Sequence, residues 1–212
     1  DYRDLSPKWK LLGQVLIALA VAASGIRVTM FVDNNTFSYF VTVLWILTVT
    51  NAVNFQDNMN GLCPGLGIIC GWFFAWHSCL EGQYLVASLA FLFTGALFGF
   101  LPFNFPKGGV FLGDGGSHLV GFLLSVLAVL PDFYSNANPY KWLIITPLLV
   151  LFIPLTDLIS VIVIRFRLKQ PIWVGDNNHF SHHLVKAGHS KTKAVLLLLL
   201  LSAFVGAVTF FV

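Results

Sequence analysis

The chain has 212 residues, of which 57% are hydrophobic and only 10% are charged. A soluble domain has about 25% charged residues, so this composition excludes an ordinary soluble protein and favours an integral membrane protein. The net charge of +3 is too small to indicate a nucleic-acid partner. The three cysteines, Cys63, Cys70 and Cys79, show no paired spacing typical of a zinc site or a disulfide framework.

Seven stretches of the chain are apolar enough to be interpreted as membrane-spanning segments. A spanning helix needs roughly 20 predominantly apolar residues. Because a segment in lipid must satisfy its own backbone hydrogen bonds, we expect helices throughout. The predicted fold is an all-α, polytopic transmembrane bundle that forms one domain over residues 1–212. The predicted spans are residues 12–32, 38–53, 62–80, 84–103, 112–130, 142–164 and 193–212.

Lys and Arg are divided unequally between the two sides of this predicted bundle. Alternate connections share a side, which leaves only Arg27 and Lys141 of the 12 basic residues on the poorer side. Cytoplasmic loops contain the excess of Lys and Arg. We therefore predict that the N-terminal end and the loops 54–61, 104–113 and 165–192 face the cytoplasm.

The turn after the second predicted span is unusually polar, with Asn54, Asp57, Asn58 and Asn60 close together. Carboxylate and amide oxygens are the ligands that Mg²⁺ prefers, and Asn54 and Asp57 share a face if the segment is helical. Asn and Asp also favour caps and turns, so Asn58 and Asn60 fit a structural role equally well. For Asn54 and Asp57 we favour function, because one cap does not require so many polar groups.

A glycine-rich segment containing Asp114 enters the fifth predicted span. Glycines let the backbone approach a phosphate closely, and a helix N-terminus offers free N–H groups to an anion. Asp114 could be a simple N-cap. However, an acid at membrane depth costs about 2.5–3.5 kcal/mol on insertion scales and usually marks function. We expect Asp114 to be functional and His118 to pack.

Three of the six histidines, His179, His182 and His183, fall within five residues. His179 and His182 share a face of a helical turn. Such a group could bind phosphate or move protons. A zinc site and a solvated loop without a role are the alternatives, although the chain has no HExxH motif. We assign a structural role to Asp157, which lies inside the sixth predicted span.

Three motifs together resemble those of the polyprenyl-phosphate N-acetylhexosamine-1-phosphate transferases. They are NAVNFQDNMNGL, FLPFNFPKGGVFLGDGGSHLVGF and DNNHFSHHLVKAG. The opening DYRDLSPKWKLLGQ also looks like the family's segment after its paired aspartates. The resemblance spans essentially the whole chain, and it implies a fold with more helices, so we expect that N-terminal spans are missing here.

The resemblance implies a reaction between two substrates. The phosphate of a polyprenyl (undecaprenyl) phosphate lipid would attack the β-phosphorus of a UDP-sugar, and UMP would leave. The product, a polyprenyl-diphospho-sugar, would start the synthesis of a cell-envelope glycan. We expect a multi-pass protein of the bacterial inner membrane with a cytoplasmic active site, and the sequence leaves homo-oligomer formation open.

The resemblance also assigns roles to the candidate residues. Asn54 and Asp114 would hold Mg²⁺, with Mn²⁺ as an alternative ion. The expected catalytic residues are Asp1, Asp57, Asp114 and His182. The expected substrate-binding residues are Asn60, His179 and His183.

Rival interpretations stay open beside this one. HFSHH replaces the three consecutive histidines of the phospho-N-acetylmuramoyl-pentapeptide transferases, which favours the branch that uses simple UDP-N-acetylhexosamines. A muramoyl-pentapeptide transferase is nevertheless an alternative. A transporter would explain the intramembrane acids Asp114 and Asp157, although the polar residues crowd one face. A non-catalytic scaffold would not need three polar clusters.

Overall fold

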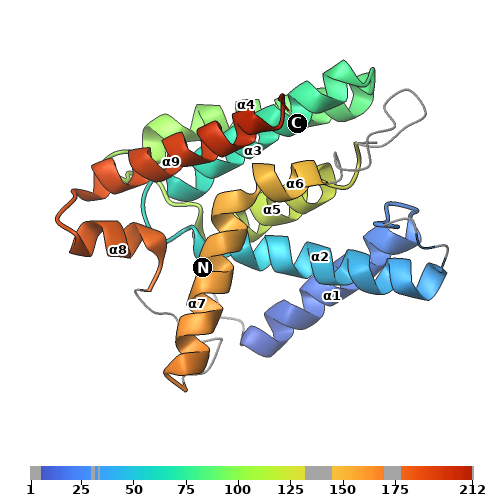
Figure 1. Ribbon diagram of the computed structural model, residues 1–212, viewed down its shortest axis with the longest axis horizontal. Coiled ribbons are helices and arrows are strands. Elements are labelled where there is room, and N and C mark those ends of the chain that lie inside the picture. Colours follow the sequence, from blue (N-terminus) through green and yellow to red (C-terminus); the bar gives the residue numbers. More distant parts are fainter. Residues whose placement is uncertain (1–5, 30–31, 33, 132–144, 170–177, 212) are drawn as a thin grey trace.

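The computed structural model (Figure 1) describes residues 6–29, 32, 34–131, 145–169 and 178–211. All regular structure in these ranges is helical, which confirms the predicted all-α class for this part of the chain. The helices are α1 (Pro7–Ala23), α2 (Asn35–Phe55), α3 (Leu62–Leu80), α4 (Tyr84–Asn104), α5 (Gly113–Leu127), α6 (Thr146–Val150), α7 (Phe152–Arg167), α8 (Phe180–Lys186) and α9 (Lys191–Val208). Asp1 lies outside the described residues.

Four of the described helices, α2, α3, α4 and α9, are long and apolar enough to cross a membrane. The chain is therefore a multi-pass membrane protein, but the predicted seven spans are not confirmed. α1 has 17 residues and α5 has 15. At 1.5 Å per residue, α5 is about 22 Å long, which is shorter than the ~30 Å hydrocarbon core.

The predicted span 142–164 is divided, in its described part, into α6 and α7. α6 ends at Val150 and α7 begins at Phe152. Pro154 has no N–H to donate to the carbonyl of Val150, four residues earlier, so a continuous helix would lose a hydrogen bond and clash there. Figure 1 shows that α7 runs in a direction different from that of α6.

The helix pair α2 and α5 packs with almost no space between the backbones. A Cβ atom built on Gly121 of α5 would lie 2.7 Å from the carbonyl oxygen of Thr50 in α2. Only glycine allows this approach without a shift of one helix. Thr50 lies one turn before Asn54, and Gly121 lies two turns after Asp114. The close packing therefore sets the distance between the two predicted metal ligands.

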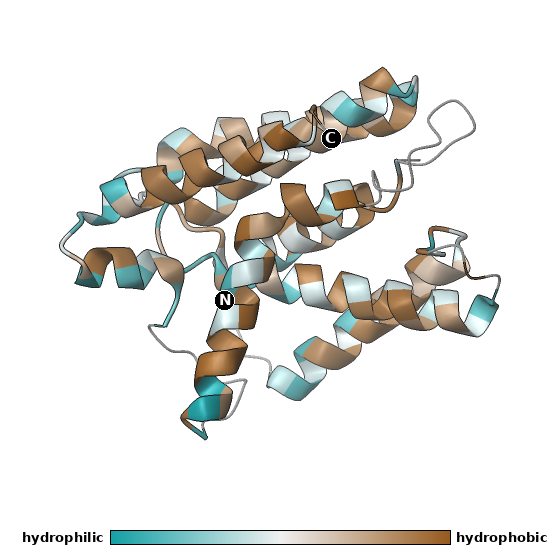
Figure 2. Cartoon of the chain, in the orientation of Figure 1, coloured by the Kyte–Doolittle hydropathy of each residue, from teal (hydrophilic) through white to brown (hydrophobic). Residues whose placement is uncertain are grey.

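Apolar side chains cover the outside of the bundle as well as its core. Leu92 and Phe98 of α4 and Leu200 and Phe204 of α9 are all exposed. A soluble monomer rarely exposes so large a contiguous apolar surface, so these faces are suited to contact lipid. Hydrophilic residues gather instead at the free end of α7, in α8 and at the link into α9 (Figure 2).

Candidate functional site

The polar turn, residues 54–61, joins α2 to α3 at the site. It ends at Gly61, whose φ of +83° places it in the left-handed region that favours glycine. A Cβ atom there would also lie 2.4 Å from the ring of Phe105. Asn104, which is buried, accepts a hydrogen bond from the Gly61 N–H at 2.6 Å and donates one to the Val110 carbonyl at 2.8 Å. Asn104 thus ties the polar turn to the loop that leads to Asp114.

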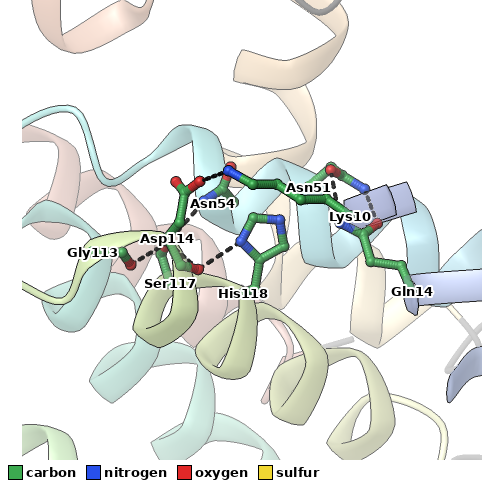
Figure 3. A network of polar contacts seen from close by, with 8 residues as sticks. All are labelled: Lys10, Gln14, Asn51, Asn54, Gly113, Asp114, Ser117 and His118. Atoms are coloured by element: carbon green, nitrogen blue, oxygen red, sulfur yellow. Dashed lines mark hydrogen bonds and ion pairs between the residues drawn. The ribbon is translucent and has the colours of Figure 1, made fainter. Parts of the chain in front are cut away.

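Asp114 lies in the first turn of α5 beside Asn54 (Figure 3). Its carboxylate forms an ion pair with the ammonium group of Lys10 from α1. The Asn54 amide donates to the Ser117 hydroxyl at 2.7 Å, and the Asn54 side chain also hydrogen-bonds with Asp114. The structure therefore brings together the two residues expected to hold the metal, although they are 60 positions apart.

α1 is held against this cluster by a second polar contact. The Asn51 amide of α2 donates to the Gln14 side-chain oxygen of α1 at 2.7 Å (Figure 3). Gln14 lies one turn after Lys10, so both side chains are on the same face of α1. This face is directed at α2 and α5, and the pairing with Asn51 places the Lys10 ammonium group at Asp114.

The donor set around Asp114 fits a magnesium ion that is shared with a substrate. Asp114 offers carboxylate oxygens and Asn54 offers an amide oxygen, which are the hard ligands that Mg²⁺ prefers. The Lys10 ammonium group shows that this position accepts a positive charge. Within the described residues, no three His, Cys, Asp or Glu side chains form a metal-binding group. Phosphate oxygens and water would therefore have to complete the coordination.

Asp57 lies in the polar turn, outside the helices, and its side chain is half-buried. The pKa of this carboxyl is raised from 3.8 to about 6, mainly by burial and to a smaller extent by the negative charge of Asp114. Asp57 can therefore gain or lose a proton near neutral pH. Asn60, at the other end of the turn, lies against Gly108, where an added Cβ atom would come within 2.3 Å of the Asn60 amide.

A second polar cluster forms around Asp157 of α7, whose side chain is only 1% exposed. Its Oδ2 accepts from the Gln56 amide at 2.9 Å and bonds to His179 Nδ1 at 2.7 Å. Its Oδ1 accepts from the backbone N–H of Phe180 at 2.7 Å. Asp157 therefore connects the polar turn to the start of α8, which is a larger structural role than spacing alone indicated.

The histidine segment, residues 179–183, lies beside the polar turn. The Ser181 hydroxyl donates to the Asn58 side-chain oxygen at 2.6 Å, and the ring of His179 packs edge-on against Phe55 at 5.8 Å between centroids. His179 is buried, whereas His183 is exposed and His182 is half-exposed. Among the three, His182 and His183 are therefore the histidines that are open to a ligand.

His182 lies on α8, with its ring centroid 6.3 Å from that of His179. Partial burial lowers the pKa of His182 below its usual 6.5, and neighbouring basic residues, among them Lys186 and Lys191, lower it further. His182 is therefore mainly neutral at pH 7, and a neutral imidazole can accept a proton or a hydrogen bond.

Several contacts of the site were not predicted from the sequence. Lys10, Ser117 and Gln56 lie in the segments that carry the family resemblance, but no feature of their spacing indicated the contacts that they make. Asn104 lay inside the motif that carries the family resemblance, but nothing in its spacing indicated a bond to Gly61. A polar residue at the end of an apolar span is the one signal that could have singled it out.

Comparison with known proteins gives consistent relationships. Residues 1–132 match glycosyl transferase family 4. The chain is 32% identical over 209 residues to a probable undecaprenyl-phosphate N-acetylglucosaminyl 1-phosphate transferase of Bacillus subtilis (strain 168), which covers 95% of the chain and 58% of the relative. It is 31% identical over 221 residues to a decaprenyl-phosphate N-acetylglucosaminephosphotransferase of Mycobacterium leprae (strain TN), which covers 92% of the chain and 54% of the relative.

A more distant relative has a similar name. The chain is 27% identical over 176 residues to the undecaprenyl-phosphate alpha-N-acetylglucosaminyl 1-phosphate transferase of Escherichia coli (strain K12), covering 81% of the chain and 47% of the relative. The chain thus spans about half the length of the curated relatives it matches.

Proposed function

The chain belongs to glycosyl transferase family 4, and from this we propose that it is part of a membrane enzyme that transfers a sugar 1-phosphate to a polyprenyl phosphate. The donor is a UDP-N-acetylhexosamine, and the products are a polyprenyl-diphospho-sugar and UMP. The relatives described above are named for transfer of N-acetylglucosamine 1-phosphate to undecaprenyl or decaprenyl phosphate, which makes UDP-N-acetylglucosamine the first donor to test.

One observation supports this proposal more than any other. The polar turn contacts the Asp114 cluster through Asn54, and it contacts the histidine segment directly through Asn58. Gln56 reaches the histidine segment through Asp157, which bonds to both Gln56 and His179. Three segments far apart in the sequence therefore meet at one end of the bundle. Phosphoryl transfer depends on positioning and charge neutralisation rather than on covalent chemistry by the protein, and such a site combines acids, amides, a lysine and histidines.

In the proposed reaction, an oxygen of the lipid phosphate forms a bond to the β-phosphorus of the donor. The bond between that phosphorus and the oxygen bridging to the α-phosphate breaks, and UMP leaves with the electron pair. Asn54 and Asp114 would hold Mg²⁺, which when bound would supply the charge neutralisation that this approach of two anions requires. Lys10 adds a positive charge at the same place.

The remaining candidate residues have proposed roles at the two substrates. Asp57 and Asn60 lie on the nucleotide side, and the Asp57 carboxylate can hold a proton because its pKa is about 6. The neutral ring of His182 binds phosphate or accepts a proton, and His183 contributes a second ring beside it. Asp1, which lies outside the described residues, is the proposed partner of the acceptor phosphate.

We place the site on the cytoplasmic side of the bacterial inner membrane. The excess of Lys and Arg in the connections on that side supports this orientation. Nucleotide sugars are made in the cytoplasm, so a donor site there needs no transport step. The lipid substrate reaches the same end of the bundle from within the membrane.

The test uses the full-length protein that contains this chain, purified with undecaprenyl phosphate, Mg²⁺ and UDP-N-acetylglucosamine labelled in the sugar. We expect a lipid-extractable labelled product and one UMP per product. Asn35→Ala, which removes only an exposed hydrogen bond to Arg27, is the matched control for site variants. If product forms only with UDP-N-acetylmuramoyl-pentapeptide, the protein is a phospho-N-acetylmuramoyl-pentapeptide transferase instead. If no UDP-amino sugar gives a product, the proposal is refuted.

A further inference from the structure

Asp157 is a buried acid whose role the reaction outlined above does not explain. An ionised carboxylate in apolar surroundings is costly unless its oxygens are hydrogen-bonded. Here both oxygens are, by Gln56, by His179 and by the Phe180 N–H. Stability alone is a weak reason for such an arrangement, because well-packed apolar residues often replace buried polar groups at no cost. The role of Asp157 therefore has to be sought in the three groups that it binds.

Asp157 sets where α8 begins. His179 occupies the N-cap position of α8, but its side chain makes no capping hydrogen bond. The first backbone N–H of the helix, that of Phe180, donates to Asp157 Oδ1 instead. A capping acceptor is thus supplied by a different helix, α7, and the position of α8 follows that of Asp157.

Asp157 also fixes the ring of His179. A carboxylate can only accept a hydrogen bond, so the bond to Asp157 Oδ2 requires a proton on Nδ1 of the His179 ring. Carboxylates fix histidine tautomer and orientation in this way in metal sites and in catalytic triads. The edge-on contact with Phe55 restrains the same ring from another side.

The same carboxylate reaches the polar turn. Gln56, which donates to Asp157 Oδ2, lies between Asn54 and Asp57 in the sequence. One side chain therefore links the segment that contains the proposed metal ligand to the helix that contains His182. Movement of Asp157 would change the distance between these two halves of the site.

We propose that Asp157 is a positioning residue for the transfer reaction: it holds His179 in one tautomer and orientation, and it places α8, with His182, against the polar turn. This inference rests on the proposed function. It predicts that the carboxylate is needed for turnover although it contacts neither substrate.

The test is Asp157→Asn in the full-length protein. The amide is nearly isosteric and can still accept from the Phe180 N–H, but it cannot accept from both Gln56 and His179 at its other atom. We expect kcat to fall about 10²- to 10⁴-fold, from the loss typical of a carboxylate behind a metal-bound histidine to that of a triad aspartate replaced by asparagine. KM for the UDP-sugar should change less than about threefold, because binding contacts are kept. Thr156→Val, the neighbouring substitution on α7, is the control and should keep wild-type kcat.

A spectroscopic measurement separates positioning from stability. Nitrogen-15 NMR of labelled histidine should show a protonated Nδ1 on His179 in the wild type and a changed tautomer in Asp157→Asn. Lower thermal stability with wild-type kcat in the folded fraction would overturn the proposal, as would an unchanged His179 signal. Because this signal does not depend on turnover, it reports on Asp157 even if the protein is no transferase.

A second variant covers the case in which Asp157→Asn does not fold. Phe180→Pro removes the backbone donor to Asp157 Oδ1, and proline is tolerated at the first position of a helix. It also removes the Phe180 ring, which packs on the apolar cluster that contains Leu62 and Val195, so Phe180→Ala, which removes the ring and keeps the donor, is its control. We expect kcat to fall at least tenfold relative to Phe180→Ala, since the first turn of α8 loses its backbone hydrogen bond to α7. Wild-type kcat in this variant would contradict the proposed placement of α8.

Discussion

Replacing Asn104 with alanine should separate the polar turn from the loop that leads to Asp114. The Asn104 side chain is 2% exposed and makes two hydrogen bonds, from the Gly61 N–H at 2.6 Å and to the Val110 carbonyl at 2.8 Å. Alanine can make neither. Both backbone groups would then lose their side-chain partner, and Asn54 and Asp114 would lose a connection that keeps them together.

The expected loss of stability follows from these two bonds. A buried polar group left without a partner costs about 1–3 kcal/mol, so the variant should lose about 2–6 kcal/mol of unfolding free energy, out of a typical total of about 5–15 kcal/mol. For a chain of this size, 1 kcal/mol corresponds to a shift of about 2–4 °C in Tm. Asn104→Asp keeps the acceptor for Gly61 but sets a buried carboxylate oxygen against the Val110 carbonyl, so it should lose no less stability than Asn104→Ala.

The protein contains its own reporters for this measurement. Cys63 and Cys70 are completely buried, so a thiol-reactive dye should label them only when the bundle unfolds. We expect Tm of Asn104→Ala to fall by at least about 4 °C, while the control Asn35→Ala stays within about 0.5 kcal/mol of wild type. If the Tm of Asn104→Ala equals that of Asn35→Ala, Asn104 does not connect the two segments as described.

Three further predictions concern the site itself. Asp114→Asn should abolish turnover and leave Tm within a few degrees of wild type, because a neutral amide cannot replace the charge at the ion site; wild-type turnover would exclude a metal role. Because the pKa of Asp57 is raised to about 6, its carboxylate is lost as pH falls, so kcat/KM should fall below pH ~6. In Asp57→Asn this fall of kcat/KM at low pH should be absent; a fall that persists would come from the titration of another group. Gly121→Ala should lower Tm and kcat together, because the new methyl group meets the Thr50 backbone at 2.7 Å, whereas Gly95→Ala, with open space, should change neither.

The long apolar helices could be predicted closely from the sequence. The predicted spans 62–80 and 84–103 correspond to α3 (Leu62–Leu80) and α4 (Tyr84–Asn104). Hydropathy determines such helices locally, since each residue contributes to burial in lipid independently. The division of 142–164 was not predicted, although Pro154 was visible in the sequence. Whether a proline bends or breaks a helix depends on its tertiary neighbours.

The candidate site was predictable where polar residues cluster in the chain. The proximity of Asn54 to Asp114 followed from the predicted side of the membrane and from the family resemblance, and the structure places the two side chains together. The pairing of Asp157 with His179 was not predictable, because it depends on α7 turning away from α6. The contact of Lys10 with Asp114 depends likewise on how α1 packs on α2.

The central claim is that a divalent ion joins Asp114 to the phosphates of a nucleotide sugar. Mn²⁺ can replace Mg²⁺ at an oxygen-ligand site and is paramagnetic, so pulsed EPR of the full-length protein with Mn²⁺ and UDP-N-acetylglucosamine detects phosphorus nuclei near the ion. We predict a phosphorus-31 coupling from protein-bound Mn²⁺ in the wild type and its loss in Asp114→Asn at the same concentrations. The same coupling and the same amount of bound Mn²⁺ in both proteins would contradict the account.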